Sequence, residues 1–97
     1  MRLYIDDVRP LPQGFDVLAK TAGEATAFLQ TGNVKFLSFD HDLGTEATGY
    51  SVALWIEGAV QAGHIPCPQW EVHSSNPVGR ERINAAMLSA WNIQHGK

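Results

Sequence analysis

The chain alternates between strand-like and helix-like segments along its length. Short apolar runs rich in β-branched or aromatic residues lie at residues 2–7, 15–20, 34–39 and 70–74. Apolar residues spaced three and four positions apart lie between 21 and 32, at 49–62 and from 77 onwards. Strands that alternate with amphipathic helices form a mostly parallel sheet with helices packed on it. The pattern therefore predicts an α/β fold with about four parallel strands and three helices.

Local signals mark where the helices begin. Thr21 and Glu24 have the spacing of a capping box, in which each side chain can bond a free amide of the first turn. Asn76 followed by Pro77 is typical of a helix start, with Asn at the N-cap and Pro at the first helical position. Residues 8–14 contain two prolines and a glycine, so we expect the first connection to be a loop rather than a helix.

Length and composition indicate one small cytoplasmic domain spanning 1–97. The net charge of −3 argues against nonspecific binding along a nucleic-acid duplex, which depends on many Lys and Arg contacts. The single cysteine, Cys67, cannot form an internal disulfide, which fits a reducing compartment. Because no apolar run approaches the ~20 residues of a membrane span, we expect no membrane insertion. The residues leave the oligomeric state open.

Polar and ionisable residues gather where the predicted strands end. In parallel sheets, ligands bind outside the carboxyl ends of the strands. The residues that follow the first, third and fourth core strands are Asp6 and Asp7; Asp40, His41 and Asp42; and His73, Ser74, Ser75 and Asn76. We therefore expect these side chains to meet at one end of the sheet and to form a functional site there.

The acidic residues at this end favour a divalent cation. Two carboxylates ~4 Å apart repel by roughly 4 kcal/mol at an effective dielectric constant of ~20, so a cluster of them takes up protons or binds cations. Mg²⁺ prefers carboxylate oxygens and commonly brings a phosphate with it. Mg²⁺ or another divalent metal is thus the predicted cofactor. Its candidate ligands are Asp6, Asp7, Asp40 and Asp42.

A phosphate group would find several partners close to these carboxylates. The predicted helix start after Asn76 offers backbone amides and a positive dipole end, and a glycine there allows close approach. The candidate phosphate-binding residues are Ser74, Ser75, Asn76, Gly79, Arg80 and Arg9. His41 and His73 are the side chains best suited to acid–base chemistry near neutral pH. Asp40 is the third candidate catalytic residue.

From the sequence alone, several of these residues could have a structural role instead of a functional one. Asp42 could cap the turn rather than bind metal. His73 could be a half-buried histidine with satisfied hydrogen bonds, and Asn76 is a helix cap before it is a ligand contact. Arg80 could be a solvated helix charge.

Four stretches, "LYIDDVRP", "FDHDLG", "GYSVALWI" and "HSSNPVGRERI", resemble the cyclic-phosphate-processing receiver domains. The resemblance implies a small flavodoxin-like, receiver-like three-layer fold whose first crossover is reduced to a loop. It also implies a role on cyclic phosphate ends of RNA, in RNA-repair or phage–host conflict settings. By the same resemblance, Asp6 and Asp7 match the Mg²⁺-binding acidic pair of ordinary receivers, Asp40 their phosphoacceptor, and Ser74 lies near their phosphoryl-contacting Ser/Thr.

The chain also departs from an ordinary receiver. We find no fifth strand with the lysine that contacts an acyl phosphate, while His41 and His73 are additions. These differences favour a phosphoesterase-like hydrolase that acts on a cyclic nucleotide or an RNA end with a cyclic phosphate. The alternatives are a non-catalytic module that binds a cyclic nucleotide, and a degenerate receiver that binds a protein partner.

Overall fold

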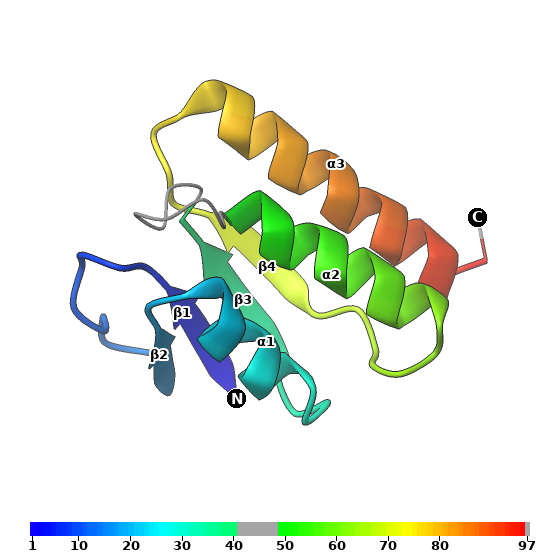
Figure 1. The fold of residues 1–97 in the computed structure, drawn as a ribbon, viewed down its shortest axis with the longest axis horizontal. Helices are drawn as coiled ribbons and strands as arrows, with labels where there is room; N and C mark the ends of the chain where they lie inside the picture. Colours follow the sequence, from blue (N-terminus) through cyan, green and yellow to red (C-terminus); the bar gives the residue numbers. More distant parts are fainter. Residues whose placement is uncertain (41–48, 97) are drawn as a thin grey trace.

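The computed structural model describes residues 1–40 and 49–96 (Figure 1). Its elements in chain order are β1 (Arg2–Ile5), β2 (Val17–Ala19), α1 (Ala22–Leu29), β3 (Phe36–Phe39), α2 (Gly49–Gln61), β4 (Gln69–Val72) and α3 (Pro77–Gln94). The strands form one sheet in the order β2-β1-β3-β4, and every neighbouring pair is parallel. The α/β fold predicted from the alternating pattern is confirmed.

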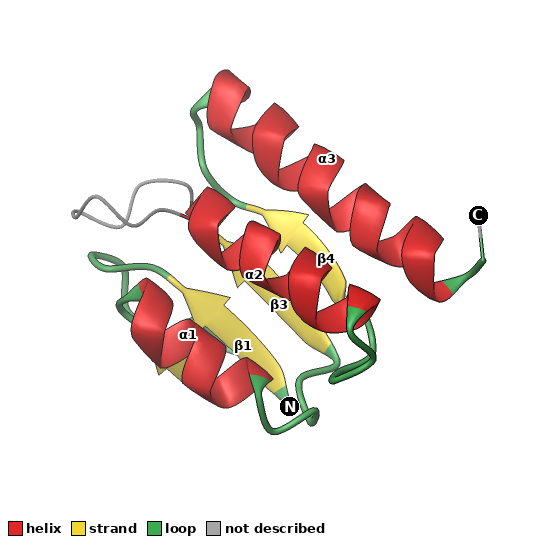
Figure 2. Cartoon of the chain, turned by 45° about the vertical axis from the view of Figure 1, so that its right-hand side comes forward, coloured by secondary structure: helices red, strands yellow, loops and turns green. Residues whose placement is uncertain are grey.

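The three helices pack over one face of the sheet (Figures 1 and 2). Strand residues alternate between the two faces, and one set of them forms the core against the helices. Leu3 and Ile5 of β1 and Leu37 and Phe39 of β3 are fully buried in this core. The same buried core cluster contains Val52 and Ile56 of α2 and Ile83 and Met87 of α3.

The opposite face carries the connection from β1 to β2. Phe15 of this connection packs edge-on against Tyr4, with ring centroids 5.1 Å apart, and lies 6.0 Å from Phe36. The Arg2 guanidinium lies 5.1 Å from the Phe15 ring and 4.4 Å from the Phe36 ring. Among the described residues, a loop thus takes the place of the third layer, as the prolines of residues 8–14 predict.

Helix caps form as predicted, with one difference at α1. The Thr21 hydroxyl accepts a hydrogen bond from the Glu24 amide at 3.1 Å. The Glu24 carboxylate accepts from the Lys20 amide at 2.7 Å, one residue before the Thr21 amide that a capping box predicts. The two side chains of the motif, Thr21 and Glu24, therefore each accept one hydrogen bond from a backbone amide at the start of α1.

Within the described residues, no helix combines the length and the apolar character that a membrane-spanning segment needs.

Asn76 is the matching cap of α3 and gives a first testable prediction. Its side-chain oxygen accepts from the Gly79 amide at 3.1 Å. We expect Asn76→Ala to lower the free energy of unfolding by about 1 kcal/mol, because this amide loses its partner. Urea denaturation measures the change. Asn92→Ala, an exposed position in the last turns of the same helix, is the control, and an equal loss there would contradict the capping role.

Candidate functional site

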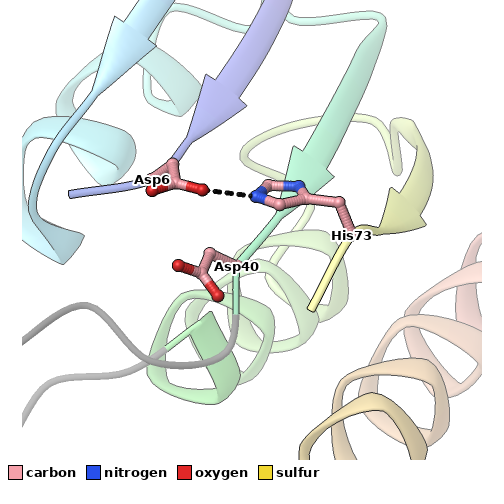
Figure 3. Close-up of side chains that lie close together, drawn as sticks. All are labelled: Asp6, Asp40 and His73. Carbon is pink, nitrogen blue, oxygen red and sulfur yellow. Dashed lines mark hydrogen bonds and ion pairs between the residues drawn. The ribbon is translucent and has the colours of Figure 1, made fainter. Parts of the chain in front are cut away.

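Three side chains meet at the carboxyl end of the sheet (Figure 3). Asp6, Asp40 and His73 each offer one ligand atom, and these atoms lie within 4.8 Å of one another. The register explains the convergence, because Ile5 is aligned with Phe39 and Phe39 with Val72, and each of the three residues directly follows one of these positions. Sequence reasoning placed these residues at one end of the sheet, and the structure brings them together.

Asp6 is the most enclosed member of the cluster, with 1% of its surface exposed. One carboxylate oxygen accepts hydrogen bonds from the amides of Val8 and Arg9, both at 2.9 Å. The other lies 2.9 Å from His73 Nε2. Burial by itself raises the pKa of Asp6, but the hydrogen bonds from Arg9, Val8 and His73 outweigh it and leave the pKa lowered. Asp6 is therefore a carboxylate at neutral pH.

His73 is held on three sides. Nε2 faces Asp6, and Nδ1 lies 2.7 Å from the hydroxyl of Ser38. The imidazole stacks on the Tyr4 ring, with centroids 4.5 Å apart and an angle of 8° between the planes. Sequence reasoning missed Ser38 and Tyr4 as partners of this histidine. The available signal was a hydroxyl in the middle of an apolar strand, "FLSF", two residues before Asp40.

Arg9 brings a positive charge beside the cluster. Its Nη1 lies 3.7 Å from the Asp6 carboxylate and donates to the His73 carbonyl oxygen at 3.4 Å. A side-chain hydrogen bond with Tyr4 raises the pKa of Arg9, and the charges of Asp6 and Asp40 act in the same direction. Because 54% of its side chain is exposed, the guanidinium can also contact a ligand from solvent.

The residues after β4 hold a turn into α3. Ser74 is buried, and its hydroxyl accepts from the Asn76 amide at 3.1 Å. Arg80 donates to the Ser74 carbonyl at 3.4 Å. With the Gly79 amide bonded to Asn76 and no amide hydrogen on Pro77, this helix start has fewer free donors than the sequence suggests.

The remaining predicted site residues are not among the three clustered ligands or lie outside the described residues. Asp7 is half-buried and does not belong to the group of three ligands, and Ser75 is exposed. His41 and Asp42 lie outside the described residues. Their predicted roles in catalysis and metal binding therefore stay predictions.

Cys67 does not fit a reactive nucleophile. It lies in the connection between α2 and β4 and is buried there. Burial raises the pKa of its thiol to about 11, so little thiolate exists near neutral pH.

The chemistry of the three clustered donors fits a divalent cation. Two carboxylates and one imidazole supply a net negative site, and carboxylate oxygens are the preferred ligands of Mg²⁺. The imidazole extends the range to Zn²⁺ and other transition metals. Asp6 and Asp40 are thus the residues that would hold the metal, and His73 would be a third ligand only where it does not act in proton transfer.

A parallel four-stranded sheet with an acidic cluster at its carboxyl end defines a receiver-like α/β domain. The family model for the cyclic-phosphate processing receiver domain matches residues 1–89, and the chain belongs to this family. Comparisons with curated proteins and with solved structures found no significant match.

The lowered pKa of Asp6 has a consequence for stability in acid. Its stabilising contribution is fully present above the ordinary value of 3.8 and is lost as the pH falls through the lower value in the folded protein. We expect the unfolding free energy of Asp6→Asn to decrease less steeply with falling pH below 3.8 than that of the wild type. The asparagine amide has no carboxylate to protonate, so this part of the acid destabilisation is absent. Urea denaturation at several pH values tests this, with the exposed Glu81→Gln as control. An unchanged slope in Asp6→Asn would contradict the assignment.

Proposed function

We propose that this protein hydrolyses a cyclic phosphodiester at the cluster of Asp6, Asp40 and His73. The observation that carries the proposal is the convergence of two carboxylates and an imidazole at the ligand-binding end of a domain from a cyclic-phosphate processing family. The substrate class is a 2′,3′-cyclic phosphate, either at an RNA end or in a free cyclic nucleotide. An RNA-repair or phage–host setting fits such a substrate.

The reaction needs one water and two proton transfers. The water oxygen forms a bond to phosphorus while the bond from phosphorus to one ring oxygen breaks. The water gives up a proton to a base, and the departing oxygen takes a proton from an acid. The products are a phosphate monoester and a free hydroxyl. His73, oriented by Asp6, supplies one of the two groups, and His41 is the predicted other.

One charge beside the cluster, that of the Arg9 guanidinium, suits a phosphate as ligand. Arg9 lies beside Asp6 with an exposed guanidinium, which can bond the phosphate oxygens as negative charge develops on them. A divalent cation bound by Asp6 and Asp40 would polarise the phosphate and offset the repulsion between the carboxylates and this anion. Histidine chemistry without a metal is the variant of this proposal.

An ordinary phosphoacceptor role is less well supported. Asp40 does directly follow β3, at the position that receivers phosphorylate. However, the sheet formed by residues 1–40 and 49–96 has four strands, so a fifth strand carrying a phosphate-contacting lysine is not seen there. Simple aspartyl phosphorylation also does not require a histidine such as His73 within the acidic cluster.

Phosphorus NMR of the purified protein with 2′,3′-cyclic AMP and with an RNA ending in a 2′,3′-cyclic phosphate tests the proposal. We expect the cyclic phosphate signal to be replaced by that of a monoester, with and without added Mg²⁺ as separate samples. Binding with no product after long incubation would contradict hydrolysis and favour a sequestering module. Neither binding nor product would contradict the proposed ligand class and favour a receiver that acts through protein contacts.

A further inference from the structure

We propose that Arg9 sets the order in which ligands enter the site. Its charge opposes a divalent cation by itself and favours a phosphate, so the cation enters together with the phosphate-bearing ligand. This ordering rests on the proposed function, which supplies both ligands. Arg9 is then more than a contact for the phosphate, because its charge decides which of the two ligands the site accepts first.

The loop after β1 fixes Arg9 beside the cluster through both its backbone and its side chain. The Arg9 amide donates to one carboxylate oxygen of Asp6 at 2.9 Å. The guanidinium lies near the other oxygen, with Nη1 3.7 Å away, and reaches across to the His73 carbonyl at 3.4 Å. A side-chain hydrogen bond with Tyr4 adds a further contact, and the charge of Asp40 also acts on the guanidinium. The fold itself therefore holds a positive charge next to the two carboxylates.

One carboxylate oxygen of Asp6 is shared between Arg9 and the cluster. Oδ1 already accepts from the amides of Val8 and Arg9, whereas Oδ2 faces both His73 and the guanidinium. A Mg²⁺ ion lies ~2.1 Å from a ligand oxygen, so an ion on Oδ2 would lie at most ~6 Å from Nη1 of Arg9. That distance is shorter than the screening length of ~10 Å at 0.1 M salt, and arginine keeps its charge at neutral pH. The cation on its own therefore meets a repulsion that Arg9 causes.

A phosphate meets the opposite effect from the same side chain. More than half of the Arg9 side chain is exposed, and its contacts with Asp6 and with the His73 carbonyl both use Nη1. Because a guanidinium carries five N–H donors, others can bond phosphate oxygens. This attraction offsets the repulsion between the phosphate and the carboxylates. A phosphate that also coordinates the cation gives it an attraction that the cation lacks by itself, so the two ligands enter together.

Arg9→Gln tests the ordering, because it should change the two affinities in opposite directions. We expect Mg²⁺ alone to bind Arg9→Gln about tenfold more tightly than the wild type, the effect of removing a unit charge ~6 Å from a divalent ion in water. We expect inorganic phosphate, measured in chelator, to bind it about tenfold more weakly, because a charge-assisted contact is lost. Isothermal titration calorimetry measures both dissociation constants. A variant that is merely misfolded would weaken both.

Lys35→Gln is the matched control. Lys35 is exposed directly before β3, at the opposite end of the sheet, and its loss changes the net charge by the same amount. We expect it to bind both ligands as the wild type does, and Arg9→Lys to keep the weaker Mg²⁺ binding of the wild type because it keeps the charge.

Three results would overturn the inference: Mg²⁺ binding in Arg9→Gln that is no tighter than in the wild type, a loss of affinity for both ligands, or no binding of either ligand to the wild type. Inorganic phosphate has no ring to open, so the measurement needs no turnover. Hydrolysis of a cyclic phosphate with an unchanged Mg²⁺ affinity in Arg9→Gln would overturn the ordering and leave the proposed function intact. Opposite shifts without any hydrolysis would support the ordering and contradict the proposed function.

Discussion

His73→Ala is expected to lower the rate of 2′,3′-cyclic AMP hydrolysis by about 10²- to 10⁴-fold, the usual effect of removing an acid–base group. The imidazole is the neutral-pH proton carrier of the described cluster, and Asp6 at 2.9 Å orients it. Alanine leaves Asp6 and Asp40 in place but removes the group that exchanges protons with water or the departing oxygen. Initial rates at saturating substrate measure the loss in kcat directly.

His95→Ala is the matched control for this substitution. His95 is exposed at the end of α3, where its ring stacks on Trp91 with centroids 3.9 Å apart, and it has no contact with the cluster. We expect its rate to equal that of the wild type and expect His41→Ala to lose activity as His73→Ala does. Undiminished hydrolysis in both the His41 and His73 variants would exclude the two-histidine mechanism. Thermal midpoints of all three variants show whether any loss comes from unfolding.

A divalent cation is expected to raise the thermal midpoint strongly. A ligand at 100 times its dissociation constant stabilises the folded state by about 2.7 kcal/mol, which corresponds to a shift of about 10–20 °C in a domain of this size. The clustered carboxylates of Asp6 and Asp40 supply the site, and cation binding also relieves their repulsion. A thermal-shift titration with Mg²⁺, repeated with Mn²⁺, measures the effect.

Asp40→Asn is expected to remove most of this shift, because the amide withdraws one of the two carboxylate ligands. Asp16→Asn is the control, since Asp16 is exposed and accepts from the Arg2 amide, away from the cluster. Each variant is compared with its own midpoint in chelator, so that intrinsic changes in stability cancel. A wild-type midpoint that does not respond to either cation would contradict the metal site. Hydrolysis by the histidines without a metal would then be the remaining form of the proposed mechanism.

Most of the fold could be predicted from the sequence because its signals are local. Capping residues such as Thr21 and Asn76 mark helix starts within one turn, and the prolines of residues 8–14 exclude a helix there. Strand ends are visible as the change from apolar to ionisable residues. A parallel sheet then places all these ends together, which is why Asp6, Asp40 and His73 could be grouped from the sequence alone.

The partners of His73 could not be predicted in the same way, because they depend on strand register. Shifting a strand by one residue moves each side chain to the other face. The hydrogen bonds that link Ser38 to Glu71 and to His73 form only with Ser38 opposite Glu71. Arg9 reaches across 64 residues of sequence to the His73 carbonyl, and no local pattern encodes such a contact.

Amide chemical-shift mapping with 2′,3′-cyclic AMP shows where the nucleotide binds, and so tests whether the carboxyl end of this sheet is the site of the cyclic phosphate. We predict that the changes concentrate at residues 6–9, at Asp40 and at residues 73–76, where the cluster, Arg9 and the turn into α3 lie. Changes confined to the opposite end of the sheet, around residues 30–35 and 65–69, would contradict the account, as would a spectrum that does not respond to the nucleotide.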